Sequence, residues 1–360
     1  MRKKLNFHTI GELFCGPGGG GLGALLAEVK ISESIHRFEH VWASDLDMDS
    51  CKTYSKSVLG SNEVLSDTVI CGDARKLPLE NSDVFPRVEG FLFGFPCNDF
   101  SIVGESKGMD GKFGPLYKQG IRVLSRPDAP DWFLAENVGG LTSANEGKAF
   151  KAITDEMLNA GYNLVAHKYK FEEYGVPQKR HRIIIIGMKK KLGLQFKVPK
   201  PFNFRVSAAV ALDNIPSSVT HNERTKQSAT VVERLNFLKA GQNAWQPNLP
   251  NHLKLNVKGA RLSNIYKRLL PDEPSYTVTG SGGGGTHMYH WEEPRALTNR
   301  ERARLQTFPD YFQFVGSKES VRKQIGMAIP PEGAKIILEA VLKTLLGIEY
   351  EFVVPNLNVD

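Results

Sequence analysis

The sequence predicts an α/β protein built on a sheet with helices on both faces, together with a smaller irregular domain. In the first half, apolar segments alternate with helical ones: HTIGELF (8–14) reads as a strand, LGALLAEVK (22–30) as a helix and HVWASD (40–45) as a strand. Such repeats are typical of a parallel sheet with helices on both faces. After about Lys191 this periodicity fades and Pro, Asn and Gly become frequent. A long irregular stretch indicates a second domain rather than a continuation of the first.

The alternation continues through the first half of the chain. We expect further strands at 68–73, 88–95, 131–137, 163–171 and 182–188, and helices at 48–59 and 147–160. In the irregular part, 207–216 and 231–241 could form short helices. The segment GAKIILEAVLKTLLG (333–347) has the periodicity of an amphipathic helix and is expected to pack back on the sheet.

Composition narrows the functional class. The chain has 360 residues and a formal net charge of +7, which favours a polyanionic partner, most often nucleic acid. Its cysteines, Cys15, Cys51, Cys71 and Cys97, show no C-x-x-C spacing, so neither a metal site nor a disulfide framework is predicted. No segment approaches the roughly 18 apolar residues of a membrane span. We therefore expect a cytoplasmic protein with reduced thiols.

A glycine-rich loop, ELFCGPGGGGLG, lies between the first predicted strand and helix. Gly16, Gly18 and Gly21 satisfy the pattern G-x-G-x-x-G, which lets the backbone approach a ligand at a helix start. Asp45 and Asp73 end the next two strands, where carboxylates could accept from ribose hydroxyls and an adenine amino group. Taken singly, the loop could be a tight turn and each aspartate a helix cap. Together they predict an adenosine-containing cofactor, either a dinucleotide or S-adenosylmethionine.

The segment GFPCNDFS places a cysteine at the end of another strand. Ligands bind at the carboxyl ends of strands in such sheets, and Pro96 restricts the backbone just before Cys97. A cysteine is a nucleophile only as its thiolate, and a lone cysteine after a strand is more often a small buried hydrophobe. Glu136, in LAENV, ends a strand expected to neighbour this one. A carboxylate near a thiol in an apolar cleft could protonate a substrate ring.

The segment YGVPQKRHRIIIIG carries polar side chains into an apolar strand. Strand alternation would put Gln178, Arg180 and Arg182 on one face. Because buried arginines need anionic or carbonyl partners, this face could hold a substrate, although a solvated basic edge would give the same pattern.

In order along the chain, these stretches resemble the cytosine-C5 DNA methyltransferases of the bacterial type. The matching segments are LFCGPGGGGLG, GFPCNDFS, AENV, QKRHR, PSYTVT, PRALTNRERARLQTFPD and QIGMAIPP, and they span residues 13–331. Each is weak by itself, but Pro-Cys, Glu-Asn-Val and Gln-x-Arg-x-Arg in this order are highly specific. The resemblance implies a Rossmann-like, S-adenosylmethionine-dependent fold. It also implies transfer of a methyl group to C5 of a cytosine flipped out of double-stranded DNA.

The resemblance also implies residue roles. Cys97 would attack C6 of the cytosine, Glu136 would contact N3 and the amino group, and Arg180 and Arg182 would hold the base, substrate phosphates or the catalytic carboxylate. Cofactor contacts would come from Phe14, Gly16, Gly18, Asp45, Leu46, Asp73, Pro96, Leu116 and Met327. DNA contacts would come from Asn98, Ser101 and Thr277. The stretch 101–114 matches the family's mobile loop.

The same resemblance sets the expected domains. They are a catalytic and cofactor-binding domain (1–196), a target-recognition domain (197–295), a return segment with the C-terminal helix that completes the catalytic domain (296–348) and a tail (349–360). Two positions differ from the family's common sequence: Asn98 stands where Gln is usual, and Met327 where Asn is usual. We expect the fold to tolerate both and cofactor binding to be weaker without the Asn amide.

The sequence thus predicts a site-specific DNA (cytosine-5)-methyltransferase, monomeric and metal-free, that protects DNA beside a restriction endonuclease. A tRNA cytosine methyltransferase is an alternative, because a related family uses this fold on RNA; the basic insertion before PSYTVT favours DNA. A catalytically silent DNA-binding regulator is a second alternative, against which Cys97, Glu136 and the two arginines argue. A dinucleotide oxidoreductase would explain the glycine loop but not the Pro-Cys segment.

Overall fold

The computed structural model describes residues 4–95, 116–142, 147–256, 262–283 and 285–359. The chain forms two compact units. The first comprises residues 1–170, 181–201 and 331–360, and the second comprises residues 171–180 and 202–330. None of the helices in the described parts is long and apolar enough to cross a membrane.

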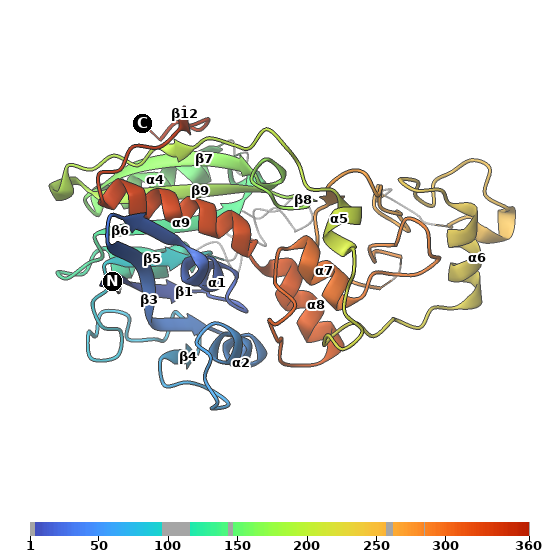
Figure 1. The fold of residues 1–360 in the computed structure, drawn as a ribbon, viewed down its shortest axis with the longest axis horizontal. Coiled ribbons are helices and arrows are strands. Elements are labelled where there is room, and N and C mark those ends of the chain that lie inside the picture. The colour runs from blue at the N-terminus through green and yellow to red at the C-terminus, as the bar shows by residue number, and fades with distance from the viewer. Residues whose placement is uncertain (1–3, 96–115, 143–146, 257–261, 284, 360) are drawn as a thin grey trace. The chain divides into compact units, whose positions relative to one another are not determined.

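The first unit is built on an eight-stranded sheet (Figure 1). Its strands follow the order β2-β3-β1-β5-β6-β9-β7, and β4 pairs with β3 beside β2. The bounds are β1 (Lys4–Leu13), β2 (Glu28–Ile31), β3 (Ser34–Asp45), β4 (Val69–Cys71), β5 (Gly90–Phe93), β6 (Trp132–Val138), β7 (Tyr162–Lys170) and β9 (His181–Lys189).

The strands of this sheet do not all run the same way. β4, β3, β1, β5 and β6 are mutually parallel, as the sequence predicted, whereas β2, β9 and β7 are antiparallel to their neighbours. The isoleucines at 183–186 are buried on both faces of β9. A strand buried on both faces reads as one apolar run in either direction, so the pattern could not reveal its orientation.

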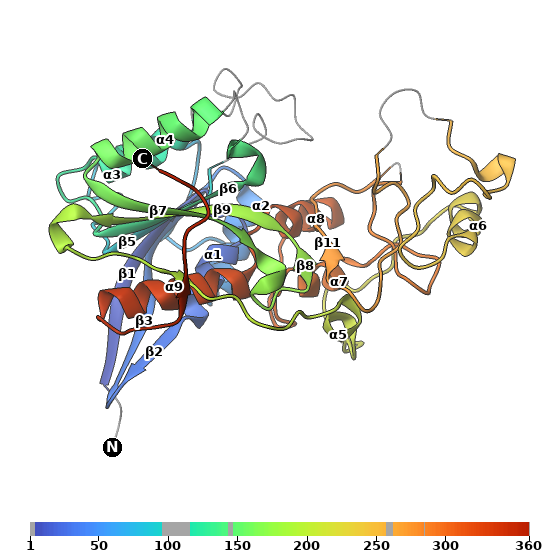
Figure 2. The same ribbon diagram turned by 90° about the horizontal axis from the view of Figure 1, so that it is seen from above.

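Helices cover both faces of the sheet, which confirms the predicted fold class (Figure 2). α3 and α4 lie on one face, and α1 and α9 lie on the other. The helices of this unit are α1 (Gly19–Leu26), α2 (Met48–Ser57), α3 (Tyr117–Leu124), α4 (Lys148–Asn159) and α9 (Pro331–Leu345).

The helix expected at 22–30 was wrong at its C-terminal end. α1 ends at Leu26, and β2 follows at Glu28 as an antiparallel partner of β3. Val29 and Ile31 favour a strand, and pairing with β3 outweighs the helical period of the preceding residues. The 333–347 helix forms as α9 and packs on α1. A Cβ at Gly23 would lie 2.5 Å from the Ala334 Cβ, so this close approach needs glycine.

The tail beyond α9 adds a small pairing to the first unit. Within it, β12 (Phe352–Val353) pairs antiparallel with β10 (Val198–Pro199). Asn356 then accepts from the backbone N–H of Lys168, at the edge strand β7, at 2.7 Å. The last residues are therefore tied to the sheet rather than separate from it.

The second unit has little regular structure, as expected for this part of the chain. Its elements are β8 (Gln178–Lys179), α5 (Ala208–Leu212), α6 (Ala229–Phe237), β11 (Ser275–Tyr276), α7 (Asn299–Leu305) and α8 (Lys318–Met327), with short turns between them. A small apolar core gathers side chains from widely spaced segments: Leu235, Leu238, Ala244, Leu249, Leu253, Ile265, Tyr289 and Ala296.

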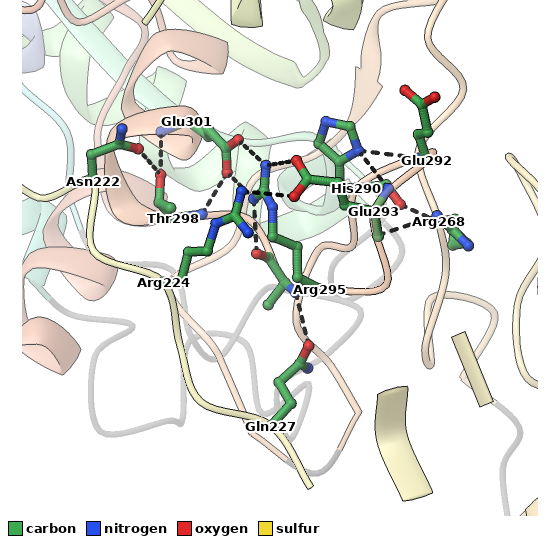
Figure 3. Close-up of polar contacts among 11 residues, drawn as sticks. Asn222, Arg224, Gln227, Arg268, His290, Glu292, Glu293, Arg295, Thr298 and Glu301 are labelled. Atoms are coloured by element: carbon green, nitrogen blue, oxygen red, sulfur yellow. Dashed lines mark hydrogen bonds and ion pairs between the residues drawn. The ribbon is translucent and has the colours of Figure 1, made fainter. Parts of the chain in front are cut away.

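Buried polar side chains replace sheet pairing in this unit. Arg295 donates to both carboxylate oxygens of Glu301 at 2.8 Å and to Glu293 at 2.9 Å (Figure 3). Glu301 also accepts from the backbone N–H of Thr298, whose hydroxyl caps the start of α7. Arg268 donates to four backbone carbonyls of the unit. These side chains satisfy backbone groups that have no strand partner.

The compact units divide the chain at other points than the expected domains. Residues 296–330 group with the second unit, and only the part from Pro331 onward returns to the first. The reason is packing, because α7 contacts both α8 and α5. Residues 171–180 also belong to the second unit. Compactness does not assign a function, so the target-recognition boundaries of 197–295 remain a prediction.

Candidate active site

The parallel strands of the first unit end at one edge of the sheet. Leu13 pairs with Ser44 on one side and with Phe93 on the other, and Phe93 pairs with Ala135. The segments that follow these strands therefore lie next to one another. They carry the glycine loop, Asp45, Asp73, residues 94–95 and Glu136. Ligands of open α/β sheets bind at this edge.

The glycine loop after β1 has the backbone that its sequence suggests. Phe14, Gly16 and Gly18 all have positive φ, at 59°, 53° and 96°. A Cβ at Gly18 would lie 2.4 Å from Val58 Cγ2, so packing and conformation both require glycine there. A Cβ at Gly16 would meet nothing within 4 Å. Open space at Gly16 leaves room for a ligand against the loop.

Asp45 ties this loop to the end of β3. Its carboxylate accepts from the backbone N–H of Gly16 at 2.8 Å and from that of Asp47 at 2.9 Å. Burial raises the pKa of Asp45 above its ordinary value. Each carboxylate oxygen can accept a second hydrogen bond, so ribose hydroxyls remain possible partners. Leu46, the next residue, leaves 67% of its surface exposed and offers an apolar face beside the carboxylate.

Asp73 follows β4 and pairs with a neighbouring cation. Its carboxylate lies 2.6 Å from the Arg75 guanidinium, and this hydrogen bond is the main reason that the pKa of Asp73 falls to about 2. An ionised carboxylate at this edge can accept from an adenine amino group, as the sequence suggested. Leu116 is buried at the start of α3, where Gly120 packs directly on Phe93.

Glu136 and Arg182 form an ion pair at the end of β6. Their Oε1 and Nε atoms lie 2.9 Å apart, with the side chains 19% and 14% exposed. The other carboxylate oxygen of Glu136 faces Gly94, where a Cβ would lie 3.3 Å away. Asn137 donates to the carbonyl of Phe95 at 3.3 Å. The pair therefore borders the chain that leads into the Pro-Cys segment.

Part of the expected site lies outside the described residues. These positions are Pro96, Cys97, Asn98 and Ser101, together with the 101–114 stretch that was expected to be a mobile loop. No group of three or more metal-ligating side chains is found elsewhere in the described chain.

The Gln-x-Arg-x-Arg segment does not form one strand. β8 ends at Lys179 and β9 begins at His181, and the chain passes from the second unit to the first between Arg180 and His181. The expectation that Gln178, Arg180 and Arg182 share one strand face was therefore wrong. The reason is a change of partner, since β8 pairs with β11 whereas β9 pairs with β6 and β7.

Three further expected site residues lie in the second unit. Arg180 is buried and donates to the carbonyl of Val278 at 3.1 Å. Thr277 donates from its hydroxyl to the carbonyl of Lys179 at 2.7 Å. Met327 ends α8 with 57% of its surface exposed.

Comparisons with known proteins agree with this geometry. The model of the family described as C-5 cytosine-specific DNA methylase matches residues 8–343. The chain belongs to this family. It is 56% identical to Type II methyltransferase M.BbvI of Brevibacillus brevis, over 97% of this chain and 93% of the relative. It is 38% identical to Type II methyltransferase M.NgoFVII of Neisseria gonorrhoeae, over 95% of this chain and 88% of the relative.

A solved structure supports the same fold. A candidate DNA modification methyltransferase encoded within an Escherichia coli prophage superposes with a TM-score of 0.71 at 23% identity, covering 94% of this chain and 99% of that one. As a C5 DNA methylase, this protein is a DNA (cytosine-5-)-methyltransferase that uses S-adenosylmethionine. The residues at the sheet edge fit that cofactor, because the loop is open at Gly16 and Asp45 and Leu46 offer a polar and an apolar contact.

A buried polar network beneath the glycine loop was missed by the sequence analysis. The Tyr54 hydroxyl lies 2.9 Å from Glu12 Oε2 and 2.9 Å from His40 Nδ1, and His40 Nε2 lies 3.0 Å from the carbonyl of Gly21. A signal was available, because Glu12 is the one carboxylate inside the apolar strand HTIGELF. In this methyltransferase the network joins β1, β3 and α2 to the first turn of α1.

Burial and hydrogen bonding together set the charge states of this network. A carbonyl only accepts, so His40 Nε2 carries the hydrogen that faces Gly21, and neutral His40 must then accept at Nδ1. The Tyr54 hydroxyl donates to Glu12 Oε2 at 2.9 Å and also lies 2.9 Å from His40 Nδ1. Burial favours the uncharged forms of both side chains, because it raises the pKa of Glu12 to about 8 and lowers that of His40 to about 4.

These pKa values predict a pH-dependent stability. The pKa of Glu12 is raised in the folded state, so protonated Glu12 stabilises the fold. This stabilisation is complete below pH 4.5, the ordinary pKa of a glutamate, and is lost as pH rises to about 8. The lowered pKa of His40 makes stability rise with pH instead, but only at pH values below 6.5, the ordinary pKa of histidine. Between pH 6.5 and 8 the wild type should lose about 2 kcal/mol of unfolding free energy relative to Glu12→Gln, at ~1.4 kcal/mol per pH unit.

Urea unfolding at pH 6.5, 7.25 and 8 measures this difference. The matched control is Glu39→Gln, which removes an exposed carboxylate from the same strand as His40 and should leave the pH dependence unchanged. A constant offset between wild type and Glu12→Gln across this range would show that Glu12 is already ionised at pH 6.5.

Proposed function

We propose that this methyltransferase modifies cytosine at a specific sequence in duplex DNA through a covalent bond between Cys97 and C6. The supporting observation is the Glu136–Arg182 pair. It holds a carboxylate against Gly94, three positions before Cys97, at the carboxyl end of the parallel strands. A carboxylate held at this edge of the sheet suits acid–base work on a cytosine ring.

The chemistry of cytosine explains why these residue types are needed. C5 is a weak nucleophile, and addition of the Cys97 thiolate to C6 makes it an enamine-like carbon. S-adenosylmethionine would supply an electrophilic methyl group to C5 and leave as the neutral thioether S-adenosylhomocysteine, because its sulfur keeps the electron pair of the broken carbon–sulfur bond. Glu136, at N3 and the amino group, supports protonation of the ring during addition, and Arg182 keeps its carboxylate in place. Once C5 carries the methyl group, a base removes the C5 proton and the carbon–sulfur bond breaks, which regenerates the thiolate.

We assign cofactor binding to the sheet edge of the first unit and to Met327. The glycine loop from Phe14 to Gly18 is open at Gly16, which leaves space for the methionine part. Asp45 retains lone pairs for ribose hydroxyls, and Asp73 is ionised beside Arg75. Leu46, Pro96 and Leu116 would supply apolar contacts to the adenine.

We assign DNA binding chiefly to the second unit. It holds 19 lysines and arginines against 12 aspartates and glutamates, which equals the formal net charge of +7 of the whole chain. Cations that neutralise phosphates provide the sequence-independent part of DNA affinity, and they offset the few kcal/mol needed to flip a base. Thr277, with the glycine run that follows it, is our candidate for a phosphate contact, and Asn98 and Ser101 are candidates on the Pro-Cys side.

Arg180 is proposed to hold the base or a substrate phosphate. We further propose that the enzyme is a monomer in the bacterial cytoplasm and protects DNA from a restriction endonuclease that reads the same sequence. The Type II names of the two relatives support the protective role. The endonuclease need not bind the methyltransferase, because both act on the same DNA site.

The first test concerns Cys97. Cys97→Ser should reduce methyl transfer to background, since a hydroxyl is a poor nucleophile at neutral pH, while DNA and cofactor still bind. Duplex DNA carrying 5-fluorocytosine should trap the wild type in a complex that survives denaturing electrophoresis, because fluorine cannot leave as a proton does. Normal turnover by Cys97→Ala would refute the covalent route, and methylation of tRNA in a parallel assay, without methylation of DNA, would refute the duplex substrate.

The second test concerns target recognition. Residues 197–295 would be exchanged for the corresponding stretch of a family member with another target, and bisulfite sequencing would identify the methylated sites. We expect the chimera to methylate the donor's sequence, because side chains in the major groove read bases directly. A folded, active chimera that kept the original target would place recognition elsewhere.

The third test concerns Met327. A side-chain amide can donate and accept, whereas a thioether is at best a weak acceptor. Met327 is largely exposed, so Met327→Asn should leave the fold intact. We expect S-adenosylmethionine to bind roughly threefold to tenfold more tightly, the value of one neutral hydrogen bond of about 0.5–1.5 kcal/mol. Calorimetric titration decides the matter, and equal or weaker binding would mean that the backbone has adapted to Met.

A further inference from the structure

We propose that Gln306 and Gln178 are positioning residues that hold three ligand-binding segments of the second unit in fixed register. The segments are Arg180, residues 277–280 and residues 326–328. This inference rests on the proposed function, which assigns the first two segments to DNA and the third to the cofactor.

Gln306 bridges the end of α7 to the end of α8. Its side chain is fully buried, and its Nε2 donates to the carbonyl of Ile325 at 2.6 Å and to that of Ala328 at 3.2 Å. These two carbonyls flank Gly326 and Met327. One amide group therefore fixes the backbone on both sides of the proposed cofactor contact.

Gln178 continues this bridge toward the DNA segments. It is also fully buried, and its Nε2 donates to Gln306 Oε1 at 2.8 Å and to the carbonyl of Leu305 at 3.2 Å. Its Oε1 accepts from the backbone N–H of Val278 at 2.7 Å. Two residues further along the chain, Arg180 returns a hydrogen bond to the carbonyl of the same Val278 at 3.1 Å.

The two amides leave no hydrogen unpaired. Each Nε2 has two hydrogens and two acceptors, and each Oε1 receives one hydrogen bond. A fully satisfied buried network rigidifies its surroundings, whereas removal of one member strands buried partners at a high cost. Gln306 is the central member, because its loss would leave two carbonyls and one amide hydrogen of Gln178 without partners.

Direct backbone packing joins the same segments. A Cβ at Gly326 would lie 2.0 Å from the backbone nitrogen of Gly280 and 2.1 Å from the carbonyl carbon of Thr279. The end of α8 therefore lies backbone against backbone on the stretch that follows Thr277. A shift of residues 326–328 must move residues 279–280 as well, so disorder at the cofactor contact would reach the DNA contact.

Gln306→Met tests this assignment. Methionine fills a similar volume but donates no hydrogen bond. We expect S-adenosylmethionine, measured by calorimetry, and a mixed-sequence duplex, measured by fluorescence anisotropy, each to bind at least tenfold more weakly. Both substitutions remove the same hydrogen-bonded connection, so their effects should not add. Combining Gln178→Met with Gln306→Met should therefore weaken binding less than twofold beyond Gln306→Met alone.

The matched control is Gln324→Met. Gln324 is a buried glutamine of α8 that donates to the carbonyl of Val315 at 2.8 Å and to the Ser320 hydroxyl at 3.2 Å, so its replacement also removes buried hydrogen bonds. It should lower the melting temperature as Gln306→Met does, yet leave both affinities within twofold of wild type. Equal losses of affinity in the two variants would mean that Gln306 acts only through stability, and would overturn the proposal.

Two further variants separate this proposal from the function on which it rests. Met327→Asn should change only cofactor affinity and Thr277→Val only DNA affinity. If both leave the affinities unchanged, the assigned contacts are wrong; if both act while Gln306→Met does not, the bridge alone is wrong. Should Gln306→Met fail to fold, Gln306→Asn keeps an amide too short to reach both carbonyls. It should weaken both ligands at least threefold, and wild-type affinities in that variant would overturn the proposal.

Discussion

The parallel pairing of β3, β1, β5 and β6 is the constraint on which the active site depends. In-register pairing of Leu13 with Ser44 and Phe93, and of Phe93 with Ala135, makes these strands end together. The glycine loop, Asp45, Asp73 and Glu136 then need only to stand at or near the ends of these strands and of β4. A register shift of one residue would turn Asp45 or Glu136 to the opposite face of the sheet and remove it from the site. Residues distant in sequence can therefore act on one substrate without long connecting loops.

The second unit has little regular structure, so contacts other than strand pairing must position its residues. Buried amides and guanidinium groups do this work, as Gln306, Arg268 and Arg295 show. Burying polar groups is costly unless every one is paired, and neutral amides are cheaper to bury than charges. The two glutamines lie where the proposed ligand segments converge. Arg295 instead pairs with Glu293 and Glu301 (Figure 3).

The apolar pattern of the sequence was sufficient to predict the parallel strands and α9, because burial of one or both faces leaves a clear period. It could not predict that β9 runs antiparallel to β6, a partner more than 40 residues earlier in the chain. It also missed β2, because the helical period of the preceding residues continues into this strand, although its partner β3 follows directly. The positions of Asp45, Asp73 and Glu136 at the ends of predicted strands identified them as candidate site residues. Tertiary contacts alone reveal the partners of these residues, and the same holds for the networks of Glu12 and Gln306. A polar residue in an apolar segment signals that a partner exists without saying which one.

The two units differ in net charge. The first unit has equal numbers of acidic and basic residues, so the whole excess of positive charge belongs to the second. A cationic unit attracts DNA at long range, and its attraction weakens as salt rises because counterions are released. On the proposed assignment, the excess positive charge lies in the unit proposed to bind DNA, and the strand edge proposed to bind the cofactor lies in the unit with no net charge.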